Sequence, residues 1–146
     1  MRKMLTIAAT VAALCVGATA FSPAVRAGTN RPFKGSARGA ITLFAPPTLV
    51  IDTAGNATHL GNFTRHETIT FTGPGTFVGH LAFVAANGDE LDADLAGHFV
   101  SADDAVGTYT FTGGTGRFSD ATGTATFAAS KSGLDVALTF KGTIDY

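Results

Sequence analysis

Apolar and polar residues alternate along most of the chain after residue 30. In residues 90–100, for example, Leu91, Ala93 and Leu95 alternate with acidic and polar positions. A repeat of two is typical of a strand that buries one face, whereas an amphipathic helix repeats about every 3.6 residues. No helical repeat of that kind occurs after residue 27. The pattern therefore predicts an all-β chain.

Turn residues such as Pro46-Pro47, Gly73-Pro74-Gly75 and Asn87-Gly88-Asp89 separate these alternating segments. Strands that recur roughly every 8–12 residues with turns between them are typical of sandwiches and barrels. The expected strands cover residues 33–44, 48–52, 57–63, 65–72, 76–86, 90–100, 106–112, 122–129 and 134–144. Residues 53–56 are expected to form a turn, and 57–63 and 65–72 can be one bent strand.

The first and last strands favour a barrel over a sandwich. Residues 33–44 and 134–144 are both long and amphipathic, and pairing them would remove two exposed sheet edges. Inward glycines such as Gly35, Gly39 and Gly107 would let strands bend around a small circumference. We therefore predict a closed antiparallel β-barrel of about eight strands, with the first and last strands as neighbours.

Residues 106–127 contain a glycine-rich corner between two strand patterns, VGTYTF and TGTATF. Three glycines at 113, 114 and 116 permit the positive φ angles of a tight reversal, and Phe118 can fold its ring over the turn. A phosphate-binding loop would need a helix after the glycines. The pattern that follows is strand-like, which favours a structural turn.

The segment GGTGRFSDATG, residues 113–123, resembles the GGTGxFxxAxG signature of dirigent proteins, and allene oxide cyclases carry a looser version. Thr58–Gly61 (THLG) is similar to a segment of small secreted bacterial proteins of unknown function. Dirigent proteins and allene oxide cyclases are eight-stranded antiparallel barrels with a central cavity that commonly assemble as trimers. The resemblance implies that fold and a homo-oligomer. It places no catalytic residue of either family on this chain.

The first 27 residues have the composition of a secretory signal peptide. A basic start at residues 1–3 precedes an apolar run over residues 4–20, and both Ala20 and Ala27 end small-x-small cleavage sites. The run is shorter than the roughly 20 residues that a spanning helix needs, so no membrane span is expected. Cleavage after Ala27 leaves residues 28–146 as a single domain in a secreted or periplasmic protein.

Removal of the signal changes the cysteine content and the charge. Cys15 is the only cysteine, so the mature chain needs a real core because no disulfide supports it. Loss of Arg2, Lys3 and Arg26 reduces the ten basic residues to seven against eleven acidic ones, a formal charge of −4. A mildly acidic domain is not suited to nucleic acid or anionic membranes as partners.

Arg65 and Glu67 are the polar exception in the alternation. They share a strand face with Phe63, Ile69 and Phe71, so a cation and an anion would point into the barrel. Buried charges are tolerated when they are paired. The pair would orient the polar head of a ligand, or Glu67 would act as an acid or base. The alternatives are a position at a barrel mouth, in water, and a bulge that turns this part of the strand over. Tyr109 and Phe111 are either core residues or a ligand platform.

The remaining polar residues show no recognisable site. Asp89, Glu90, Asp92 and Asp94 are spaced along a strand, where side chains two apart lie roughly 6–7 Å apart, too far to share one calcium ion. The four histidines have no HxH or HxxxH pairing, and the serines lack a GxSxG context. We therefore assign no catalytic residue, metal ligand or cofactor.

Two functions remain open from the sequence. The first is a barrel without enzymatic activity that binds a small apolar ligand or serves as an envelope or interaction module. The second is a cyclase-like or dirigent-like protein that guides a reactive hydrophobic intermediate by confining it. An apolar pocket with a paired polar cluster would favour handling of a ligand, and a barrel filled by its own phenylalanines would favour a structural role.

Overall fold

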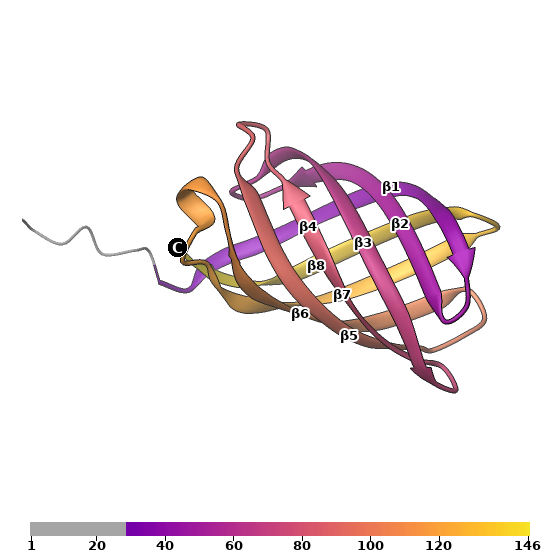
Figure 1. The fold of residues 1–146 in the computed structure, drawn as a ribbon. Coiled ribbons are helices and arrows are strands. Elements are labelled where there is room, and N and C mark those ends of the chain that lie inside the picture. The colour runs from indigo at the N-terminus through magenta and orange to yellow at the C-terminus, as the bar shows by residue number, and fades with distance from the viewer. Residues whose placement is uncertain (1–28) are drawn as a thin grey trace, which may run out of the picture.

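A computed structural model describes residues 29–146, so the predicted signal peptide lies outside the described residues. Eight antiparallel strands form a closed barrel in sequence order, with β1 beside β8 (Figure 1). The elements are β1 (Arg31–Ala45), β2 (Thr48–Ala57), β3 (Gly61–Gly73), β4 (Thr76–Val84), β5 (Glu90–Phe99), β6 (Asp104–Gly114), the short 3-10 helix η1 (Gly116–Phe118), β7 (Thr122–Ser132) and β8 (Asp135–Asp145). The all-β barrel of eight strands is therefore confirmed. Among the described residues, no helix has the length and apolar character to cross a membrane.

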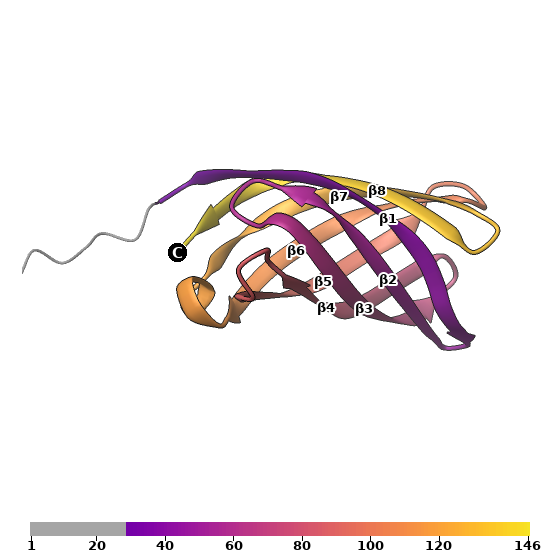
Figure 2. The same cartoon turned by 90° about the horizontal axis from the view of Figure 1, so that it is seen from above.

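The barrel closes through the pairing of β1 with β8, as the two amphipathic ends of the chain predict. The ladder runs from Arg31 opposite Ile144 to Ala40 opposite Asp135. Figure 2 shows the two strands side by side along one wall of the barrel. Neither the first nor the last strand presents a free edge, so closure protects both from pairing with another chain.

The predicted turn at residues 53–56 is wrong, because these residues belong to β2. Gly55 lies opposite Ala37 on β1 and Phe63 on β3. A Cβ at Gly55 would lie 1.9 Å from a backbone oxygen of β1, so this glycine permits close approach of two strands and does not reverse the chain. The reversal occurs three residues later and includes His59, at a φ of 67°.

The glycine-rich corner differs in part from the prediction, because two of its glycines belong to a strand and a short 3-10 helix follows them. Gly113 and Gly114 extend β6 and pair with β5 at positive φ, and a Cβ on Gly114 would lie 1.9 Å from the carbonyl oxygen of Glu90. The helix η1 follows, and its Phe118 is fully buried with its ring 5.0 Å from that of Tyr146. The corner therefore closes one end of the barrel.

The two ends of the barrel differ. We call the end that holds η1 and the described chain termini the sealed end, and the opposite end, with the β1–β2, β3–β4, β5–β6 and β7–β8 turns, the open end (Figure 1). Rings of Phe33, Phe83, Phe111 and Phe140 fill the interior toward the sealed end, and the centroids of Phe33 and Phe111 are 4.9 Å apart. Because these rings fill the half of the barrel at the sealed end, a site can lie only in the half at the open end.

Candidate functional site

Arg65 and Glu67 lie inside the barrel, on the face that the alternation of β3 predicts. Their relative exposures are 3% and 4%, whereas Thr64, His66 and Thr68 between and beside them are exposed. The two side chains form an ion pair with each other. The alternative position at a barrel mouth in water is therefore excluded.

Tyr109 and Thr53 complete this buried polar group. Arg65 donates a hydrogen bond from Nη2 to the Tyr109 hydroxyl at 2.9 Å and one from Nη1 to Thr53 Oγ1 at 3.5 Å. Burial raises the pKa of Tyr109 above its ordinary value, against the opposing effect of the Arg65 charge. The phenol therefore stays neutral at physiological pH, and two neighbouring oxygens hold the guanidinium in place.

An apolar cavity of about 100 Å³ extends from this polar group toward the open end. Leucine, isoleucine, valine and phenylalanine side chains from seven of the eight strands form most of its wall, together with Ala105 and Ala129. Glu67 is its innermost polar residue, since Ile69 and Phe71 follow it along β3 toward the open end. Arg65 does not line the cavity. A bound molecule would therefore contact the carboxylate of the ion pair and not the guanidinium.

Polar and apolar side chains surround the mouth of the cavity. Lys131 and Asp103 form a salt bridge of 2.8 Å there, and Ser130 lies beside them. Exposed apolar side chains occupy three of the four open-end turns or the residues next to them: Leu43, Phe44, Val100 and Leu134. Phe44, 63% exposed, also lines the cavity. The open end thus exposes more large apolar side chains than the sealed end.

Two of the predicted ligand residues lie behind the cavity wall. Tyr109 is fully buried against Phe127, whose ring is stacked on it at 4.6 Å between centroids. Phe111 packs in the sealed half against Phe33. Neither lines the cavity. The structure therefore brings Arg65, Glu67 and Tyr109 together and leaves Phe111 in the aromatic core.

The cavity residues other than Glu67 had no distinctive signal in the sequence. Phe77, Phe127 and Ile69 line the cavity, but they share the alternation of every other core position. Thr53 was missed because residues 53–56 were predicted as a turn. Extending the alternation of β2 by one step, from Ile51 to Thr53, would have placed this hydroxyl inside.

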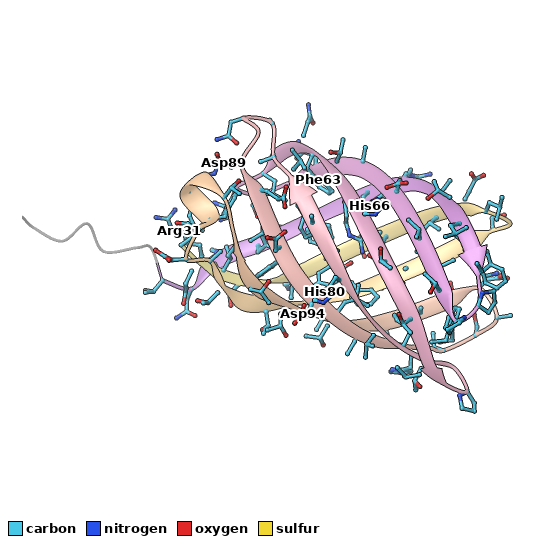
Figure 3. All side chains as sticks on the ribbon, viewed as in Figure 1. Arg31, Phe63, His66, His80, Asp89 and Asp94 are labelled. Atoms are coloured by element: carbon cyan, nitrogen blue, oxygen red, sulfur yellow. The ribbon has the colours of Figure 1, made fainter. Side chains whose placement is uncertain are left out.

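The outer wall carries two pairs of histidine and aspartate. His66 Nδ1 lies 2.6 Å from Asp52 Oδ1, and His80 Nδ1 lies 2.5 Å from Asp94 Oδ1. Figure 3 shows His66 on β3 and the His80–Asp94 pair on β4 and β5. The hydrogen bond with His66 lowers the pKa of Asp52. Within residues 29–146, no three His, Cys, Asp or Glu side chains form a group that could hold a metal ion.

Comparison with known proteins supports the fold. No family model matches the chain, and no curated protein matches it. The structure of the pterocarpan synthase dirigent protein GePTS1 superposes with a TM-score of 0.53 at 14% identity, over 82% of this chain and 93% of that one. At this identity the similarity shows a dirigent-like barrel and carries no residue role.

Proposed function

We propose that the protein binds a small apolar molecule in the cavity of the open end, with Glu67 at its inner limit. The observation that carries the proposal is a buried carboxylate at the inner end of a cavity whose wall is mostly apolar. Replacing a buried ion pair with apolar residues is often neutral or stabilising. Stability alone is therefore a poor reason for Arg65 and Glu67 in this core, and contact with a ligand is a better one.

The size of the cavity limits the ligand. A volume of about 100 Å³ is below the roughly 300–1,000 Å³ of sites for drug-sized molecules. An apolar cavity of roughly 150 Å³ accepts benzene in another protein. The cavity of this barrel is smaller than that one, so the ligand part that enters is at most a single ring or a short branched chain, and any larger molecule leaves its remainder among the exposed side chains of the mouth.

The second candidate is a dirigent-like protein that guides a reactive hydrophobic intermediate. The barrel shared with GePTS1 favours this function. Confinement beside one carboxylate would restrict how the intermediate reacts, with few catalytic groups. Formation of a single product from an intermediate that gives several in buffer would distinguish guidance from simple binding.

Export and assembly complete the proposal, and each rests on the sequence. A signal over residues 1–27 predicts a mature protein that begins at Gly28, or at Phe21 if the first cleavage site is used. The intact mass of the protein recovered outside the cytoplasm distinguishes the two. The resemblance to dirigent proteins predicts a trimer, which sedimentation analysis of the mature protein tests.

Binding is tested with a variant in which a larger side chain on the wall fills the cavity. Fluorobenzene is the probe, and fluorine NMR of the mature protein measures its affinity. Ala129→Leu, on the inner face of β7, should abolish binding, whereas Ala128→Leu, on the outer face of the same strand, should leave it unchanged. Failure of fluorobenzene to bind the unaltered protein, or equal binding by both variants, would contradict the proposal.

A further inference from the structure

We infer that the cavity selects an apolar ligand with a neutral hydroxyl and rejects one with a carboxylate; this inference rests on the proposed function. The buried pair suggests at first that Arg65 would hold an acidic head group. The contacts within the barrel indicate instead that Glu67 is the residue that meets the ligand.

Arg65 is committed to the protein. Both of its terminal nitrogens have oxygen partners, on Tyr109 and Thr53, and its Nη2 also meets Glu67. Its Nε has no hydrogen-bond partner among the described residues, but that atom is buried and Arg65 does not line the cavity. An acidic ligand in the cavity would therefore not reach the guanidinium.

Glu67 has accepting capacity to spare. A carboxylate has about four lone-pair sites and, when ionised, no donor. The ion pair with Arg65 Nη2 is made by one carboxylate oxygen, Oε2, which leaves the lone pairs of the other oxygen for a ligand. The side chain is 4% exposed and lines the cavity. The cavity thus presents a buried acceptor to its occupant, which requires a donor on the ligand.

The charge balance selects a neutral donor over a cation. Arg65 already compensates the charge of Glu67, so an ammonium group would enter an apolar cavity without a counter-charge of its own. A hydroxyl makes a charge-assisted hydrogen bond to the carboxylate without bringing a second charge. A ligand carboxylate would face Glu67 with like charge and without a donor.

Lys131 at the mouth does not reverse this selection. Its ammonium group is bound to Asp103, and it lies at the opposite end of the cavity from Glu67. An acid could approach Lys131 only by leaving its charged group at the mouth, where solvent weakens the attraction. The part of the ligand that reaches Glu67 therefore still needs a hydrogen-bond donor.

A matched set of aromatic probes tests the inference by fluorine NMR. We expect para-fluorophenol to bind roughly ten- to a hundredfold more tightly than fluorobenzene, because of the added charge-assisted hydrogen bond. Para-fluoroanisole, which lacks the donor, should show no such gain, and para-fluorobenzoate should bind more weakly than fluorobenzene. In Arg65→Met/Glu67→Leu, which keeps an apolar core, the preference for the phenol should disappear while fluorobenzene still binds.

The outcomes separate the two proposals. If fluorobenzene binds and the phenol gains nothing, or if the benzoate binds most tightly, the inference is wrong and the binding function stands. A phenol preference that persists in the double variant would also overturn it. If no probe binds the unaltered protein, the proposed function fails, and the inference fails with it.

Discussion

Neutralising Glu67 is the sharpest test of how the interior is held together. Glu67→Gln keeps the shape of the side chain but removes its charge, so Arg65 is left buried and cationic with only neutral partners. Removing one partner of a buried ion pair destabilises a protein by roughly 3–5 kcal/mol. For a domain of this length, each kcal/mol lowers the Tm by roughly 3–6 °C. A loss of roughly 10–30 °C is therefore expected.

The double variant separates the burial of a charge from the loss of a contact. Arg65→Met/Glu67→Leu removes both charges and fills their space with apolar atoms, but it leaves the buried Tyr109 hydroxyl without its Arg65 partner, so its free energy of unfolding should fall by roughly 1–3 kcal/mol at most. Urea denaturation of residues 28–146 measures the free energy of unfolding of both variants, fitted with one common dependence on urea concentration. The double variant should then be clearly more stable than the single one.

A carboxylate on the outer wall provides the matched control. Glu90→Gln makes the same chemical change beside Asp92, whose negative charge raises the pKa of Glu90. Relief of this repulsion should leave stability unchanged or slightly higher. The reasoning fails if Glu67→Gln loses less than about 1 kcal/mol, or if the double variant is as unstable as Glu67→Gln.

Three further predictions concern the rest of the barrel. Burial raises the pKa of Tyr109, so the contribution of this residue to stability is complete below its unfolded-state pKa of about 10 and is lost as the pH rises through its folded-state pKa. Tyrosinate absorbance of a Tyr146→Phe variant should therefore show that Tyr109 ionises late and together with unfolding. Ionisation of Tyr109 at its ordinary pKa in the folded protein would contradict this. Gly55→Ala should lower stability by roughly 1–3 kcal/mol, because the new Cβ meets a backbone oxygen at 1.9 Å, whereas Gly73→Ala, with a hydroxyl at 3.2 Å, should lose clearly less in the same urea titration. Phe33→Ala should cost roughly 3–5 kcal/mol by calorimetry, since its ring contacts three others in the sealed half, and a loss below about 1 kcal/mol would mean that this half is loosely packed.

The wall of the barrel was largely predictable because alternation records which face each residue buries. The pattern placed Leu91, Ala93 and Leu95 inside, and it identified the two strands that close the barrel. It failed at Gly55 and Asn56, because these turn-forming residues lie within a strand, β2. A barrel needs small residues wherever strands approach closely, and sequence alone does not separate such a glycine from one in a turn.

The candidate site was predictable only where its chemistry broke the pattern. Arg65 and Glu67 stood out as charges on an apolar face, and both are buried. The cavity itself left no such mark, because an empty space depends on how side chains from all eight strands pack together. Phe111 and Phe127 follow the same alternation in the sequence, yet Phe111 fills the core and Phe127 borders the cavity.

The unequal ends of the barrel determine how the molecule can be attached to something else. Segments joined before Arg31 or after Asp145 leave from the end that η1 covers, so a tether at either position directs the cavity entrance outward (Figure 1). Anchored in this way on a bead or an envelope, the domain would keep its entrance accessible to small molecules from the surrounding solution. An insertion between Ala45 and Thr48 would instead obstruct that entrance.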